Sequence, residues 1–182
     1  MLKRNSSGFT LIELIVTIVI MGILIGIGVP SFQDMMNNSR ASTHANNLVT
    51  AFNMARSEAV KRGQTIEVCS ANAGGTACAG AGVGWGSGWL VWWDGKNDDA
   101  AGNCDASNTA NSALAACEII RAWSTGTGAP TTTTTVDSVS FGSRGEMASS
   151  SAEITLDLCS SPYQRTLTIN PIGHIRSNRG SC

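Results

Sequence analysis

Glu13 places a carboxylate inside an otherwise apolar stretch, Phe9–Val29. An acid in a membrane-spanning helix costs about 2.5–3.5 kcal/mol on insertion scales, so it normally has a cationic partner. No lysine or arginine lies within one helical turn of Glu13. We therefore expect the partner of this acid to come from elsewhere.

The apolar stretch is long enough to cross a membrane. Its 21 residues reach about 32 Å at roughly 1.5 Å per residue, against about 30 Å for a hydrocarbon core. Lys3 and Arg4 precede the stretch, and this charge bias predicts a cytoplasmic N-terminus with the rest of the chain outside. A cleaved secretory signal is disfavoured, since no small-x-small cleavage site precedes Pro30. An ordinary signal anchor stays open.

All the cysteines of the chain follow this stretch. They are Cys69, Cys78, Cys104, Cys117, Cys159 and Cys182. An even number in an oxidising compartment favours disulfides over zinc, particularly since paired histidines and a CxxC motif are absent from the sequence. Many connectivities are possible for six cysteines. We prefer the local set Cys69–Cys78, Cys104–Cys117 and Cys159–Cys182.

The C-terminal segment 165–182 is basic, with three arginines, one histidine and no acid. An arginine presents a planar fork of donors that suits phosphate. Arg176 and Arg179 are the main candidate phosphate contacts, and Arg165 and His174 accompany them. The alternative is a solvated basic edge that meets an acidic patch on another molecule.

The sequence carries no recognisable motif for catalysis or cofactor binding. A hydrolase triad, an HExxH motif, a kinase set and a nucleotide-binding glycine loop are all absent. A formal net charge of -1 argues against nucleic-acid binding by bulk charge alone. An acidic cluster could attract Ca²⁺, but its spacing does not match an EF-hand, which favours solvated turn residues. Its members are Asp94, Asn97, Asp98, Asp99 and Asp105. We expect no enzymatic activity, no cofactor and no metal.

A helix is expected to continue through residues 30–62, with a kink at Pro30. An apolar stripe recurs every three or four residues and indicates an amphipathic helix that packs on a globular head. The stripe consists of Ala41, Ala45, Leu48, Phe52, Ala55 and Ala59. His44 is expected to be solvated on this helix.

Beyond Gly63 the composition changes to short β-type runs separated by turn residues. The predicted strands are Thr65–Ser70, Gly88–Asp94, Ile119–Ser124, Val136–Phe141, Ile154–Leu158, Arg165–Asn170 and a short strand at Gly173–Arg176. Gly74–Gly88 is expected to be a mobile loop, and Thr131–Thr135 a loop or edge strand. The fold class is therefore α+β, with a long N-terminal helix on an antiparallel sheet or small sandwich.

Alternation along the tryptophan-rich strand predicts how its side chains divide between the two faces of the sheet. Trp89, Val91 and Trp93 share one face, and Leu90 and Trp92 share the other. One of the two faces is expected to be buried and the other partly exposed. An exposed tryptophan would pack against another molecule rather than stack on a ligand.

The segment Gly8-Phe9-Thr10-Leu11-Ile12-Glu13 resembles the class III signal of type IV prepilins and type II secretion pseudopilins. The resemblance implies cleavage after Gly8 by prepilin peptidase and N-methylation of Phe9. It also implies that Glu13 pairs with the Phe9 amine of a neighbouring subunit during filament assembly. That amine is largely cationic at neutral pH, since its pKa is about 8.

The head resembles the GspH/FimT branch of the pilin superfamily. Its match comprises Trp85, Gly88, Trp89, Val91, Asp94, Glu118, Arg121 and the helix end Ser57–Gly63. The implied organisation is a leader at residues 1–8, a transmembrane helix at 9–29, an amphipathic helix at 30–62 and a periplasmic head at 63–182.

Three roles agree with this resemblance, all for a bacterial inner-membrane protein with a periplasmic head. The first is a minor pilin that initiates or caps a type IV pilus, and the second is an H-type pseudopilin of type II secretion. The third is a DNA-binding pilus subunit, because some FimT-type minor pilins bind DNA through a C-terminal Gly-Arg-x-Arg motif. Here Gly173-His174-Ile175-Arg176 departs from that motif at its first arginine.

Overall fold

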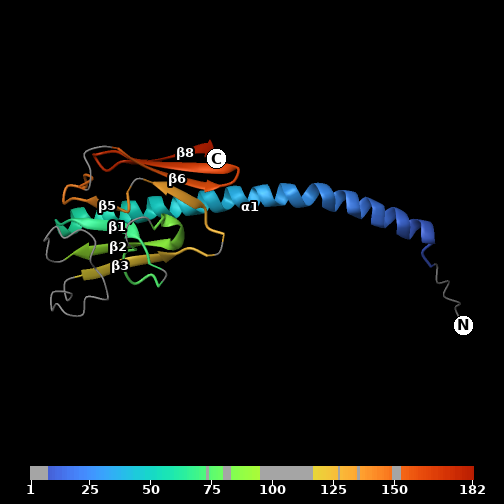
Figure 1. Cartoon of the computed structure of the whole chain (residues 1–182), viewed down its shortest axis with the longest axis horizontal. Helices are drawn as coiled ribbons and strands as arrows, with labels where there is room; N and C mark the ends of the chain where they lie inside the picture. The colour runs from blue at the N-terminus through green and yellow to red at the C-terminus, as the bar shows by residue number, and fades with distance from the viewer. Residues whose placement is uncertain are drawn as a thin grey trace, which may run out of the picture. The chain divides into compact units, whose positions relative to one another are not determined.

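A computed structural model describes residues 8–72, 74–79, 83–94, 117–126, 128–134, 136–148 and 153–182. Its elements are α1 (Leu11–Arg62), β1 (Ile66–Ser70), the short 3₁₀ helix η1 (Trp85–Ser87), β2 (Gly88–Asp94), β3 (Cys117–Ser124), β4 (Thr131–Thr134), β5 (Ser138–Phe141), β6 (Ile154–Ser160), β7 (Tyr163–Ile169) and β8 (Ile175–Ser181). The chain divides into two compact units, Met1–Met36 and Asn37–Cys182. The α+β prediction is correct (Figure 1).

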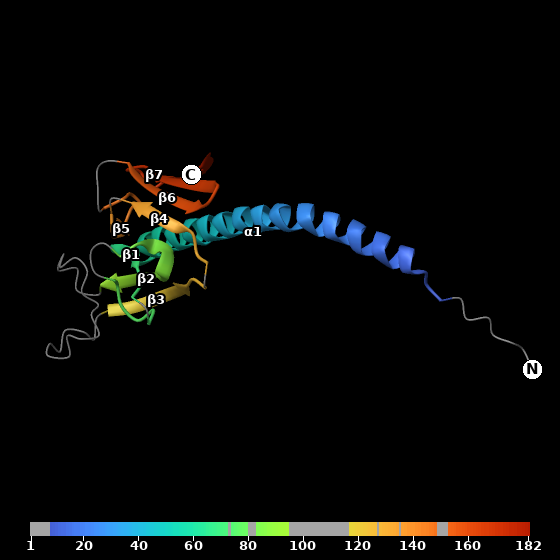
Figure 2. The same ribbon diagram turned by 45° about the vertical axis from the view of Figure 1, so that its right-hand side comes forward.

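The described residues of the head, which spans residues 37–182, form two four-stranded antiparallel sheets. One sheet has the strand order β3-β2-β1-β5, and the other has the order β4-β6-β7-β8. The second half of α1 lies beside both sheets in the two ribbon views (Figures 1 and 2). The predicted strands recur with small shifts at their ends, except that β8 extends to Ser181. The threonine run forms β4, at one edge of the second sheet.

The core of the head lies between α1 and the two sheets. The predicted stripe is buried throughout, with Leu48 and Phe52 at 0% exposure. Phe52 contacts Trp85 and Phe141, with ring centroids 5.6 and 6.4 Å apart. Alternation in the second sheet directs Leu156, Leu158, Leu167 and Ile169 to the same core. The apolar face of α1 therefore covers one face of each sheet.

His44 corrects a prediction, because it is buried rather than solvated. It is only 6% exposed, and its ring meets Trp89 edge-on at a centroid distance of 4.8 Å. Burial lowers the pKa of His44, and a hydrogen bond with the backbone of Trp85 partly offsets this effect. His44 lies three residues after Ala41 and four before Leu48, so it shares the apolar stripe.

Both faces of β2 are buried, which corrects the expectation of a partly exposed face. Trp89 and Val91 join the main core. Leu90 and Trp92, at 1% and 3% exposure, form a second cluster on the opposite face. This smaller cluster also contains Cys69, Ala71 and Cys78. The disulfide loop and its neighbours therefore cover this second face of the strand.

Trp85 belongs to the segment that was expected to be a mobile loop, yet it is fully buried. The Trp85 indole donates a hydrogen bond to the backbone oxygen of Val136 at 3.1 Å. Gly88 follows η1 with φ +125, and a Cβ there would collide with the backbone oxygen of Trp123. The entry to β2 is therefore a fixed structure that needs a glycine.

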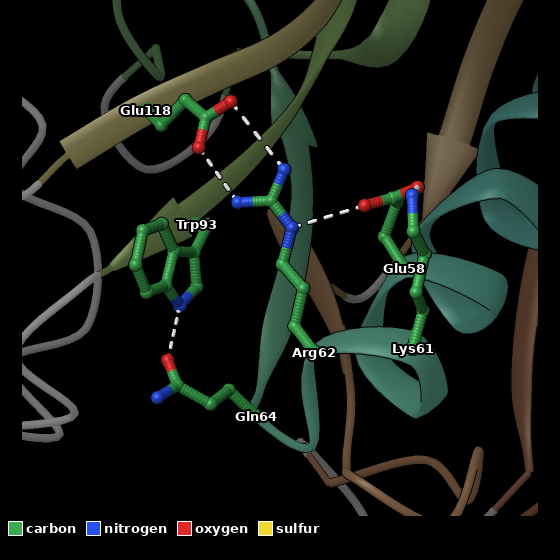
Figure 3. A network of polar contacts seen from close by, with 6 residues as sticks. All are labelled: Glu58, Lys61, Arg62, Gln64, Trp93 and Glu118. Atoms are coloured by element: carbon green, nitrogen blue, oxygen red, sulfur yellow. Dashed lines mark hydrogen bonds and ion pairs between the residues drawn. The ribbon is translucent and has the colours of Figure 1, made fainter.

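Arg62 connects the end of α1 to β3. Its guanidinium contacts the carboxylates of Glu58 and Glu118, at 3.0 and 2.6 Å (Figure 3). It also lies over the ring of Trp93, 5.1 Å from the centroid. The Trp93 indole in turn donates to the side chain of Gln64. These hydrogen bonds from Arg62 lower the pKa values of Glu58 and Glu118 and raise that of Arg62 itself.

Candidate functional site

The N-terminal unit, as far as it is described, is an apolar helix whose side chains are all exposed. Residues 8–36 are exposed without exception. The fractions include 89% for Phe9, 75% for Leu11 and 65% for Leu24. Within the described residues, one helix is long and apolar enough to cross a membrane, and it continues through Pro30. Such a helix, apolar all round, needs lipid or other protein to cover it.

Glu13 helps to form the start of this helix, which the sequence reasoning missed. The backbone nitrogen and hydroxyl of Thr10 both donate to Oε2 of Glu13 at 3.0 Å. In return, the backbone nitrogen of Glu13 donates to the Thr10 hydroxyl at 3.3 Å. This reciprocal arrangement is a capping box, and the spacing Thr-x-x-Glu is its sequence signature. It orients the carboxylate at the start of the helix, four residues from Phe9.

Two disulfides join described residues of the head. Cys69 pairs with Cys78, and Cys159 pairs with Cys182. These are two pairs of the preferred set, and the third, Cys104–Cys117, lies outside the described residues, as does the acidic cluster from Asn97 to Asp105. The second disulfide closes a separation of 23 residues and fixes the end of β8 to the end of β6.

Arg165 is buried and does not belong to the basic surface, which corrects its predicted role. Its side chain is 6% exposed. The guanidinium donates to the Ser42 hydroxyl at 2.7 Å and to the Asn38 side-chain oxygen at 3.0 Å. Arg165 lies on the same face of β7 as the buried Leu167 and Ile169, because the three residues are spaced by two. Its side chain therefore points to α1 instead of solvent. It connects the second sheet to the helix.

Arg176 and Arg179 lie on β8, the edge strand of the second sheet, and both are exposed. Arg179 is opposite Arg165 and therefore shares the face that packs on α1, whereas Arg176 is opposite Thr168 on the outer face. An odd spacing along a strand puts two side chains on opposite faces. The two arginines share an edge but not a surface.

The outer face of the second sheet contains a hollow of about 230 Å³. Its lining residues are all polar, namely Glu153, Thr168, Asn170, His174, Arg176 and Asn178. His174 and Arg176 therefore lie on the same side, as their spacing of two predicts. Glu153 is an acid at this site that the sequence reasoning did not associate with the basic tail.

The turn between β7 and β8 requires a glycine at position 173. The φ of Gly173 is +76, and a Cβ there would collide with the backbone oxygen of Gly145. Arg56 binds the same region, since it donates to the oxygen of Gly145 at 2.8 Å and to that of Ile172 at 3.3 Å. Gly173, the first residue of the segment compared with the DNA-binding motif, is therefore needed for close packing of this turn against the backbone of Gly145. This structural role is independent of any ligand.

The motif residues that carry the resemblance have structural roles in the head. Trp85 and Trp89 fill the core, and Glu118 binds Arg62. Arg121 lies over Trp123, 4.8 Å from its ring centroid. A catalytic constellation does not emerge from these contacts.

Two protein-family models match the chain. The family described as "Type II transport protein GspH" matches residues 44–173, and the "Prokaryotic N-terminal methylation motif" matches residues 3–29. The fimbrial protein EcpC of Eikenella corrodens is 46% identical over 55 residues. That match covers 30% of this chain and 31% of EcpC, so the chain aligns with about a third of its length.

Two crystal structures of the type IV minor pilin FimU from Pseudomonas aeruginosa share the fold. Both have a TM-score of 0.52 at 20% identity. The matches cover 75% and 79% of this chain, and 91% and 92% of FimU. The chain belongs to the GspH/FimT family of type IV pilin-like proteins, whose members are structural subunits and not enzymes.

Proposed function

We propose that the chain is a minor pilin, cleaved after Gly8, methylated at Phe9 and assembled into a type IV pilus-like filament. The observation that carries this proposal is the exposed apolar half of α1, with Glu13 at its start. The methylation motif at residues 3–29 supports the processing step. Before assembly, this half anchors the protein in the inner membrane by a single pass, with the head in the periplasm.

Cleavage creates the cation that Glu13 requires. It exposes the α-amine of Phe9, which is largely protonated near neutral pH because its pKa is about 8. In its own chain, Glu13 accepts hydrogen bonds from Thr10 through Oε2. We propose that this carboxylate also binds the Phe9 amine of a neighbouring subunit. Since an unpaired buried charge is costly, the pairing sets the register between subunits.

A role in initiating or capping a pilus fits the relatives. EcpC is a fimbrial protein and FimU is a type IV minor pilin. The second candidate is an H-type pseudopilin of type II secretion, which the family description favours. Deletion of the gene separates the two. Loss of surface pili with normal protein export supports the minor pilin, and loss of export with normal pili supports the pseudopilin.

DNA binding is the least supported of the three roles. Arg165 is buried and bound to α1. Arg176 and Arg179 face opposite sides of β8, and the acid Glu153 lines the same hollow as Arg176. A gel shift of the full chain in detergent micelles, with Arg176→Ala as control, tests this role. No shift at low salt ends it.

The assembly mechanism is tested by Glu13→Ala. We expect cleavage to remain largely intact, whereas incorporation into sheared filaments falls at least about tenfold, the ratio for the loss of one strong charge-assisted contact. Glu153→Ala is the matched control, because it removes an exposed acid of the head and should incorporate normally. Normal incorporation of Glu13→Ala would contradict the pairing mechanism.

A further inference from the structure

The hollow on the outer face of the second sheet runs across three strands. Glu153 directly precedes β6, Thr168 lies on β7 and Arg176 lies on β8. Neighbouring strands are about 4.8 Å apart, so the hollow extends about 10 Å across the sheet. A ligand in it lies over the sheet face and meets side chains, whereas a strand added to the edge of β8 would meet main-chain groups.

The hydrogen-bonding groups of the hollow are available for a ligand. Within the described part of the chain, no hydrogen bond or ion pair uses the side chains of Glu153, Arg176 or Asn178. The Asn170 side-chain oxygen accepts from the backbone of His174, which fixes the turn, and no contact among the described residues uses the amide donors of Asn170. The hollow therefore offers both hydrogen-bond donors and hydrogen-bond acceptors to a ligand.

This mixture distinguishes between classes of ligand. A carboxylate such as that of Glu153 only accepts hydrogen bonds at neutral pH, and Arg176 only donates them. A phosphodiester offers acceptors alone, so it satisfies Arg176 but is repelled by Glu153. A sugar hydroxyl donates and accepts, so a saccharide satisfies both residues together with Asn178 and Thr168.

We propose that this hollow binds a short saccharide, whose hydroxyl groups donate to Glu153 and accept from Arg176 and the neighbouring amides. The site lies in the head, on the opposite side of the second sheet from the face that packs on α1. Its function does not depend on the Glu13 mechanism, so a failure of assembly and a failure of saccharide binding are distinguishable. The minor pilin would then recognise a carbohydrate surface as well as its fellow subunits.

The test uses the full chain in a detergent without a sugar headgroup. Saturation-transfer NMR measures the binding of cellobiose, N,N′-diacetylchitobiose and trigalacturonate, and a short DNA duplex is titrated in parallel. We expect at least one saccharide to bind. Glu153→Gln and Arg176→Gln should each weaken that binding about tenfold, the ratio for the loss of a charge-assisted hydrogen bond.

Arg179→Gln is the matched control, since it removes the same charge from the same strand but on the opposite face. It should leave saccharide binding unchanged. The proposal is overturned if no saccharide binds, or if binding is insensitive to Glu153→Gln and Arg176→Gln. It is also overturned if DNA alone binds and Glu153→Gln tightens that binding, because the site then recognises phosphate. Unchanged thermal unfolding verifies that each variant is folded.

Discussion

The two halves of α1 contain similar apolar side chains in opposite environments. In the first half, Leu24 is 65% exposed, whereas in the second half Leu48 is 0% exposed. The first half is apolar on all sides and the second on a single stripe. A single apolar stripe is buried by one packing surface, which the two sheets provide. An all-round apolar surface is covered only by lipid or by several neighbours.

The two halves of the helix therefore have different functions. The second half stabilises the fold of a single subunit. The first half makes its contacts with lipid or with other subunits. Substitutions in the second half should therefore change the free energy of unfolding of the head. Substitutions in the first half should change membrane insertion and assembly.

The largest effect on the head is expected from Phe52→Ala. Phe52 is fully buried on the face of α1 that packs against the head, so its removal should lower the free energy of unfolding by about 3–5 kcal/mol. Ile20→Ala is the matched control in the first half, where Ile20 is exposed, and it should leave head unfolding unchanged. Urea titrations in detergent micelles measure both. Equal effects of the two substitutions would contradict the conclusion that only the second half of α1 stabilises the head.

Removal of the Cys159–Cys182 disulfide should have the next largest effect. The bond closes a separation of 23 residues, so the double variant C159S/C182S should lose about 3 kcal/mol in the chain-entropy estimate. Hydrogen exchange should accelerate first in β8, which carries mostly exposed side chains. The control is C69S/C78S, which should leave exchange in β8 unchanged. Slow exchange of β8 in the first variant would refute this prediction.

His44 should make the stability of the head depend on pH. Burial lowers its pKa in the folded state, so the unfolded chain binds a proton more readily. Stability is therefore fully present above the unfolded pKa of about 6.5 and decreases as the pH falls below it. His44→Phe should flatten the unfolding profile between about pH 7 and 5, where unpaired histidines titrate.

A pH dependence of unfolding that is unchanged in His44→Phe would contradict the assignment of this effect to the buried imidazole.

The smallest effect is expected at the end of α1. Arg62→Ala removes contacts to Glu58, Glu118 and Trp93, whereas Lys61→Ala removes one exposed contact to Glu58. Arg62→Ala should therefore destabilise the head slightly more than Lys61→Ala, since exposed ion pairs contribute little. Thermal unfolding at low salt compares them. A larger loss for Lys61→Ala would contradict the geometry in Figure 3.

Local patterns in the sequence predict the helix stripe and nearly all the strands, because burial on one face repeats with the period of the element. Arg165 and His44 were predicted to be exposed because their side chains are polar. Their positions on the buried faces of β7 and α1 were not taken into account. Each shares its face with buried neighbours, so the spacing already contained the correct answer. The capping box of Thr10 and Glu13 was equally visible.

Other features depend on long-range pairing and could not be read from local spacing. The sequence of β8 has no apolar alternation beyond Ile175, so its length follows from main-chain pairing with β7. Glu153 joins Arg176 only because β6, β7 and β8 are adjacent in register. The hollow and its charge balance are therefore properties of the assembled sheet.

Mass spectrometry of the native protein recovered from sheared filaments tests whether the chain is processed and assembled as a filament subunit. We expect a mature chain that begins at a monomethylated Phe9, in a fraction that contains other pilin subunits. An intact chain beginning at Met1, found solely as a monomer in the membrane fraction, would contradict this expectation.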